Sequence, residues 1–198
     1  PPPFRPPPLL EPGPPLPDPG VARLSRARLS LGLRWAQALG ADRAVLHSGL
    51  PPYTPKEAAG ARAPSLAQAL GPLLEEAQAL EAQLFLENTF EPDPESLEEV
   101  FRLLPGLGFC FDPAHARVFS RTPDPQAWLA LRPRHLHLNG TDGLYDRHWQ
   151  LDQGGLDLGW LRDLEEEGLV VVLEVRGDPT PSLRYLEALL DRALTPGA

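Results

Sequence analysis

Residues 83–88 read Gln-Leu-Phe-Leu-Glu-Asn, and this stretch decides the fold. It is a short apolar run that ends in a carboxylate and an amide. An apolar run of this length is typical of a strand that is buried on both faces of a parallel sheet. Four other stretches carry a short run of similar character, at residues 43–47, 107–111, 135–138 and 169–175. The sequence therefore predicts five strands.

Apolar residues at helical spacing lie around and between these strands. The predicted helices cover residues 21–39, 56–81, 93–104, 124–131, 157–167 and 182–194. We expect the second helix to break near Pro64 and again at Gly71–Pro72, because proline lacks the backbone N–H that a helix interior needs. A helix follows each strand, and this alternation favours parallel βαβ units.

The number of these units indicates the fold class. A (β/α)8 barrel, or TIM barrel, has eight strands and about 250 residues, whereas this chain has 198 residues. We therefore expect an α/β fold, a TIM barrel that lacks two or three N-terminal βα units in this chain. An open doubly wound sheet is the alternative architecture.

Residues 1–20 are rich in proline, which fixes φ and removes backbone donors. We expect a proline-rich loop segment there and a single, partial barrel domain over residues 21–198. A rigid surface loop is the simpler interpretation of the segment, and a ligand for an SH3-type domain is the alternative.

The composition, with 42% hydrophobic and 23% charged residues, is that of an ordinary globular protein. Its one cysteine, Cys110, excludes an internal disulfide framework. The chain has no run of about 18 apolar residues that would predict a membrane span, and it does not open with the pattern of a signal peptide. We expect a cytoplasmic protein without a membrane partner.

The formal net charge of −9 disfavours nucleic acid as a partner, although a local basic patch would suffice. Lys56 is the only lysine, methionine is absent and asparagine is scarce. Scarce Asn and Met are typical of a thermophile, while the Arg, Leu and Pro bias also fits a GC-rich genome. The sequence does not indicate an oligomeric state.

The polar residues that matter follow the predicted strands. In a barrel, functional groups lie at the carboxyl ends of the strands. Here each strand ends at or near a residue type that binds metals, and the loop after the fourth strand adds two more. These eight residues are His47, Glu87, Asp112, His115, His137, Asp146, His148 and Glu174.

Imidazoles and carboxylates together suit zinc, and carboxylates also suit manganese or magnesium. Several carboxylates at one rim repel each other unless cations or protons neutralise them. Each residue alone has a simpler interpretation: a histidine in a structural hydrogen bond, a glutamate paired with an arginine, a helix cap at Asp112-Pro113, a solvated loop at 146–148. All eight at strand ends or in one adjoining loop favour a metal site, in which Glu87 bridges two ions.

At these residues the chain resembles the xylose isomerase-like TIM barrels, also called AP endonuclease family 2, over about residues 25–190. The motifs that carry the resemblance are His47-Ser48-Gly49, Leu86-Glu87-Asn88, Asp112-Pro113-Ala114-His115, His137-Leu138-Asn139, Asp146-Arg147-His148 and Leu173-Glu174. The resemblance implies the partial TIM barrel and a site at its strand ends.

Within that family the ligand set is most similar to the endonuclease IV branch, which hydrolyses phosphodiesters in DNA with nine ligands and three zinc ions. Eight of the nine have a counterpart here, and the ninth would precede residue 1. The resemblance implies a metal-dependent, phosphodiesterase-like hydrolase with two or three zinc ions. Pro113-Ala114 departs from that branch, and the short loop at 140–145 lacks the basic residues that would grip DNA.

Two other functions remain open. A sugar or sugar-phosphate isomerase or epimerase of this family holds one divalent metal, zinc, manganese or magnesium, between two Glu, an Asp and a His. Glu87 and Glu174 would then also be catalytic proton-transfer groups, and a small-molecule sugar would replace the phosphoester as substrate. Substrate contacts would come from His115, Arg147 and Trp149. The third function is a non-catalytic metal-binding domain.

Overall fold

A computed structural model describes residues 18–164 and 168–194 of the chain. In the described residues five strands form one sheet: β1 (Arg43–His47), β2 (Gln83–Glu87), β3 (Gly108–Phe111), β4 (His135–Leu138) and β5 (Val170–Leu173). All neighbours are parallel, and their order in the sheet is their order in the chain. A doubly wound sheet reverses its strand order at a switch point. The structure therefore confirms a partial TIM barrel.

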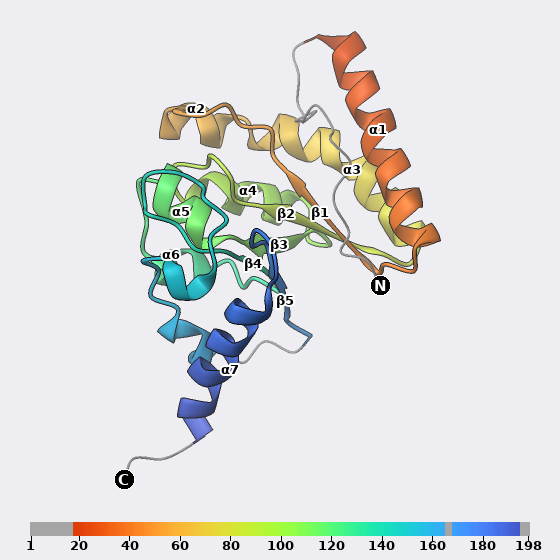
Figure 1. The fold of residues 1–198 in the computed structure, drawn as a ribbon. Helices are drawn as coiled ribbons and strands as arrows, with labels where there is room; N and C mark the ends of the chain where they lie inside the picture. Colours follow the sequence, from red (N-terminus) through yellow and green to blue (C-terminus); the bar gives the residue numbers. More distant parts are fainter. Residues whose placement is uncertain (1–17, 165–167, 195–198) are drawn as a thin grey trace.

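Helices lie between the strands in sequence and cover the curved sheet from outside (Figure 1). They are α1 (Pro19–Ala38), α2 (Lys56–Ala61), α3 (Ala63–Ala79), α4 (Glu95–Leu103), α5 (Pro113–Phe119), α6 (Pro125–Leu129) and α7 (Thr180–Leu194), with two short 3-10 turns, η1 (Leu151–Gln153) and η2 (Gly159–Asp163). None of the described helices is long and apolar enough to cross a membrane. The predicted proline-rich loop falls mostly on residues 1–17, outside the described residues.

An Asp-Pro pair precedes or begins five of the described helices: α1, α4, α5, α6 and α7. In each case the aspartate accepts a hydrogen bond from a backbone N–H of the first turn, as Asp112 does from His115 at 2.9 Å. Aspartate is a favoured N-cap, and proline at the first helical position loses no needed donor. This local chemistry fixes where each helix starts relative to the preceding strand.

Two predicted helix features are wrong. Helix α3 runs through Gly71 and Pro72 without a break, because its buried leucines, Leu70, Leu73 and Leu74 among them, pack on the sheet and outweigh one lost hydrogen bond. The segment 157–167 forms only the 3-10 turn η2, with residues 165–167 outside the described part. Helix α5, which follows Asp112, is an element that the sequence analysis predicted only as a cap or turn.

The core lies between the sheet and its outer helices. Side chains of alternate strand residues point to opposite faces, and the outward set in β3 is aromatic. Trp128 from α6 is fully buried, stacks on Phe111 with ring centroids 6.1 Å apart, and donates its Nε1–H to the Thr122 carbonyl at 2.8 Å. Phe109 and Trp160 complete this cluster. It holds β3 and its polar end in place.

We expect Trp128→Ala to lower the free energy of unfolding by about 3–5 kcal/mol, because it leaves a large cavity against Phe109 and Phe111. Denaturant unfolding measures this change. The matched control is Trp35→Ala, since Trp35 is half exposed on α1, and it should change stability by less than about 1 kcal/mol. Equal effects of the two substitutions would contradict this view of the core.

Candidate metal centre

The carboxyl ends of the strands bring the predicted ligands together. Glu87, at the end of β2, is buried and forms the hub. Its Oε2 lies 3.3 Å from His47 Nε2 and 3.0 Å from His137 Nδ1. Its Oε1 lies 3.1 Å from His115 Nδ1. His137 Nδ1 also lies 3.4 Å from Glu174 Oε1, directly after β5. One carboxylate therefore contacts imidazoles from three different segments of the chain.

The second part of the site extends from His115 to the loop after β4. Asp146 Oδ2 lies 3.5 Å from His115 Nε2 and 3.0 Å from His148 Nε2. His148 has a φ of 51°, in the left-handed region that a non-glycine residue rarely adopts. Strain of this kind is often held at functional sites. All eight residues predicted as ligands thus lie in one connected set of contacts.

Asp112 both caps helix α5 and belongs to the cluster, so the helix cap suggested by the sequence does not exclude a place in the site. Its Oδ1 caps α5, while its Oδ2 accepts a hydrogen bond from Asn139 Nδ2 at 3.1 Å and lies 3.7 Å from His115 Nδ1. Asn88 exchanges two hydrogen bonds of 2.8 Å with the Asp112 backbone. The two asparagines are site residues that the sequence analysis left out as ligands or supports, although both directly follow a glutamate or leucine at a strand end.

The donor set fits divalent metal ions. At the rim, two groups have ligand atoms that all lie within 4.8 Å of one another: Glu87, Asp112 and His115, and Glu87, His137 and Glu174. Among the described residues, Asp146 Oδ1 is buried without a hydrogen-bond partner. Buried polar atoms are rarely left so without a bound group to satisfy them. Glu87 belongs to both groups, which suits a bridging carboxylate.

The histidine rings are oriented as metal ligands usually are. His115 Nδ1 lies 2.9 Å from the Asn88 carbonyl oxygen, and His148 Nδ1 lies 2.6 Å from that of Glu174. A ring N–H that donates to a backbone carbonyl leaves Nε2 with its lone pair, and metal-binding histidines are typically fixed in this way. Both Nε2 atoms face Asp146. The observation supports Nε2 as the ligating atom of His148, whereas both ring nitrogens of His115 lie near carboxylates of the cluster.

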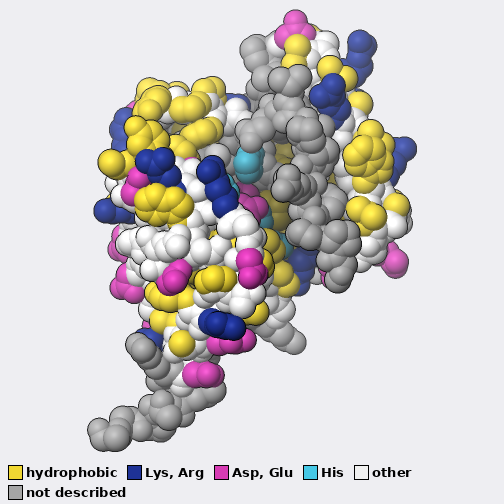
Figure 2. Space-filling view, in the orientation of Figure 1, with side chains coloured by type: hydrophobic (Ala, Val, Ile, Leu, Met, Phe, Trp, Pro, Cys, Tyr) yellow, Lys and Arg dark blue, Asp and Glu magenta, His cyan; other side chains and the backbone are white. Residues whose placement is uncertain are grey.

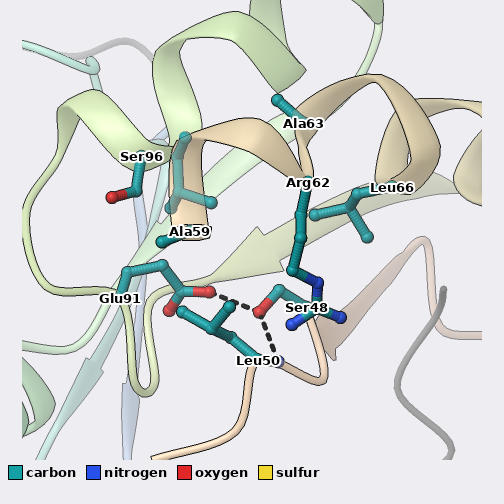
Figure 3. Close-up of a pocket in the computed structure, with 9 residues that line it drawn as sticks. Ser48, Leu50, Ala59, Arg62, Ala63, Leu66, Glu91 and Ser96 are labelled. Carbon is teal, nitrogen blue, oxygen red and sulfur yellow. Dashed lines mark hydrogen bonds between the residues drawn. The ribbon is translucent and has the colours of Figure 1, made fainter. Parts of the chain in front are cut away.

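A buried network ties the ends of β1 and β2 together behind the ligands (Figure 3). Ser48, next to His47, donates its hydroxyl to the Glu91 carboxylate and accepts a hydrogen bond from the Leu50 N–H at 3.1 Å. The other Glu91 oxygen accepts from the Thr89 N–H at 2.7 Å. Glu91 is thus shared between the loop that carries His47 and the loop that follows Glu87. It lies outside the set of eight residues that the sequence predicted.

The loop after β4 folds back on itself to present Asp146 and His148. Gly140 and Trp149 exchange two backbone hydrogen bonds, of 2.8 and 3.0 Å. A Cβ on Gly154 would lie 2.5 Å from Gly140 Cα, so only glycine allows this close approach. Histidine and acidic side chains are visible side by side in the middle of the face drawn in Figure 2.

Two of the predicted substrate contacts lie on this loop. Arg147 pairs with Asp142 at 2.8 Å and lies over the Tyr145 ring, 4.4 Å from its centroid. Trp149 is 38% exposed, and the Arg147 guanidinium is 5.6 Å from its ring. The third, His115, is buried inside the cluster. Arg147 and Trp149 therefore form a rim group that is partly open to solvent, beside the two loop ligands.

The fold agrees with a comparison of sequences. A sequence model of the family described as xylose isomerase-like TIM barrel matches residues 4–193. The chain belongs to this family. Comparison with curated proteins gave no match.

Solved structures of xylose isomerase-like barrels show the same fold. The TTHB071 protein from Thermus thermophilus, from a ZnCl₂ soak, is 54% identical, with a TM-score of 0.85 over 89% of this chain and 72% of that one. A D-tagatose 3-epimerase-like protein is 21% identical, with a TM-score of 0.73 over 88% and 72%. D-psicose 3-epimerase from Clostridium cellulolyticum, solved with D-tagatose, is 17% identical, with a TM-score of 0.63 over 94% and 72%. The last two show the fold alone.

The electrostatics of this barrel's rim follow from burial and mutual contact. Burial raises the pKa of Asp112 to about 6. Burial also opposes charge on Glu87, but the nearby His137 and the imidazole hydrogen bonds outweigh it and hold the pKa of Glu87 well below its usual range. Against its own burial, Glu87 raises the pKa of His137 to about 9. The hydrogen bond to Asp146 raises the pKa of His148 to about 9. Without metal, protonated imidazoles balance the carboxylates.

We expect the metal-free protein to lose thermal stability as the pH rises from about 6.5 to about 9. The pKa of His137 and of His148 is about 9 in the folded chain, against an ordinary value of 6.5. A group with a raised folded-state pKa stabilises the fold fully below its unfolded pKa and ceases to do so above the folded one. Thermal unfolding by circular dichroism in chelator measures the effect. His148→Gln should weaken the dependence, and a Tm that stays constant or rises across this interval would contradict the assignment.

Proposed function

We propose that the chain is a metal-dependent enzyme whose centre holds at least two divalent ions and hydrolyses phosphoesters. The observation that carries the proposal is the contact of Asp146 with both His115 and His148, beside the Glu87 hub. A centre with one metal needs only the Glu87 side of the cluster. The loop pair supplies a second set of ligands, and this favours a centre with several ions.

The residues divide into two sets around Glu87. Glu87, His137 and Glu174 would hold one ion, and Glu87, Asp112 and His115 a second, with zinc the ion that best suits this mixture of imidazole and carboxylate. Asp146 contacts His115 of the second set and also His148, and His47 contacts the carboxylate of Glu87. Bound together, two ions would activate water near neutral pH and neutralise charge on the leaving oxygen. The carboxylates of the chain would hold the ions, and the oriented histidines would complete their ligation.

The protein's own groups would handle the substrate. Glu174 is the most open of the four carboxylates in the cluster, with a side chain 32% exposed, so a substrate can reach it. Arg147 offers a cation and Trp149 a flat apolar surface on the rim. A small phosphoester fits these groups better than a nucleic acid, because the chain carries a net charge of −9.

A sugar isomerase or epimerase is the second candidate. A specific observation favours it: Glu87 and Glu174 both contact His137 Nδ1, so two carboxylates flank one imidazole. With one ion held there and by Asp112, the two glutamates would take and return a proton on opposite sides of a sugar carbon. The structural likeness to proteins named as sugar 3-epimerases is consistent with this candidate, but it rests on the fold alone.

Metal stoichiometry separates the two candidates. We expect elemental analysis of the zinc-loaded chain to give at least two ions per chain. In an Asp146→Asn/His148→Gln double variant, binding of one ion should weaken by about 10–100-fold or more, with loss of phosphodiester hydrolysis. Asp152→Asn is the matched control, because Asp152 is an exposed carboxylate in the same part of the chain.

Two different results would contradict the proposed hydrolase. One ion per chain, kept by the double variant, together with interconversion of ketose epimers, would replace the hydrolase with the epimerase. No bound ion after reconstitution with zinc or manganese would overturn both enzymatic proposals and leave only a non-catalytic role for this chain.

A further inference from the structure

A second group of metal-binding side chains lies on the inner face of β3 and β4. Cys110 is the register partner of both Glu87 on β2 and His135 on β4, so it stands in the row between them. The Cys110 Sγ and one ring nitrogen each of His135 and His137 lie within 4.8 Å of one another. All three residues are buried, and Cys110 is fully so. Neither Cys110 nor His135 is among the eight ligands of the centre above.

One histidine of this group has an unmet polar atom. His135 Nδ1 is buried without a hydrogen-bond partner among the described residues, and His135 is 5% exposed. His137 Nδ1, in contrast, already faces Glu87 and Glu174. Buried polar atoms are rarely left without a partner, and the Phe85 ring, 5.2 Å from the His135 ring, leaves an apolar wall on that side. A bound group is the simplest partner for the His135 nitrogen.

A metal ion bound to this group would form a bond with the Cys110 sulfur. The proton of the thiol would be released to solvent in the same step.

We propose that Cys110, His135 and His137 form an inner site for a soft or borderline metal ion, of the class of Zn²⁺ or Cu⁺. One sulfur and two imidazole nitrogens are a donor set that such ions prefer, whereas magnesium and manganese prefer oxygen donors. The inner site stands on its own residues and does not depend on the proposed hydrolysis. His137 belongs to both groups, so an ion in the inner site changes what His137 offers to the outer one.

Cobalt tests the proposal directly, because a thiolate bound to Co²⁺ gives an intense charge-transfer absorption that nitrogen and oxygen ligands do not. Cys110 is the only cysteine, so that band can report no other residue. We expect it to appear when the chelator-treated full chain is titrated with Co²⁺. Zn²⁺ should abolish the band by competition, and Mg²⁺ should leave it unchanged.

Variants assign the ligands. Cys110→Ser should lose the band completely, and His135→Phe should lose most of it while keeping an apolar contact with Phe85. Asp146→Asn is the matched control: it alters the outer centre and should retain the band. Circular dichroism of the metal-free variants checks that they fold, with Cys110→Ala as a second variant if Cys110→Ser does not.

The wild-type arm decides the question by itself. Cobalt binding with only the weak visible bands of nitrogen and oxygen ligation would overturn the inner site and leave the proposed outer centre standing. A charge-transfer band that survives in His135→Phe at full intensity would remove His135 from the set and also overturn the site as proposed. A chain that binds no cobalt at all would overturn both sites.

Discussion

The charge of Glu87 is the constraint on which the rest of the site depends. This side chain is 2% exposed, and a carboxylate cannot stay ionised in such surroundings without positive groups in contact with it. His47, His115 and His137 meet that need from three separate segments of the chain. Removal of these partners would leave a buried charge unpaired. The cluster is therefore held together by the same carboxylate that belongs to both candidate metal-binding groups at the rim.

The fold delivers these partners because every strand in the described residues runs in the same direction. Parallel strands place all of their carboxyl ends at one edge, and the Asp-Pro pairs start the next helices at once. Asp112 shows how closely the two functions are joined, since one oxygen caps α5 and the other faces His115. A change at such a position alters the helix start and the site together. Stability and function are thus difficult to separate at this rim.

The sequence predicted the strands and the convergence of the eight polar side chains better than it predicted the helices. Strand ends could be located because short apolar runs stop at Glu87, His137 and Glu174, and the strand-end rule then grouped these side chains without any knowledge of distances. The passage of α3 through Pro72 could not be predicted, because tertiary packing decides it. The reduction of 157–167 to a 3-10 turn is a local feature that helical spacing alone does not exclude. Asn88, Asn139 and Glu91 support the site through hydrogen bonds that depend on the exact register of neighbouring loops, and no spacing rule in the chain marks them.

His135 lies two residues before His137 on β4, so the two-residue period of a strand places both on one face, and in the structure both are buried. Along this inner face, the type of metal-donor atom changes with position on the strands. Carboxylates lie at the strand ends, at Glu87, Asp112 and Glu174. Glu87 is paired in register with Cys110 on β3, and Cys110 is paired with His135 on β4, so the donor atoms along this row change from oxygen to sulfur and nitrogen. His137 stands between the two groups and contacts both. If both proposed sites bind metal, an oxygen-rich rim above a sulfur–nitrogen interior would select different ions at different depths, and His137 would be the side chain that couples the two sites.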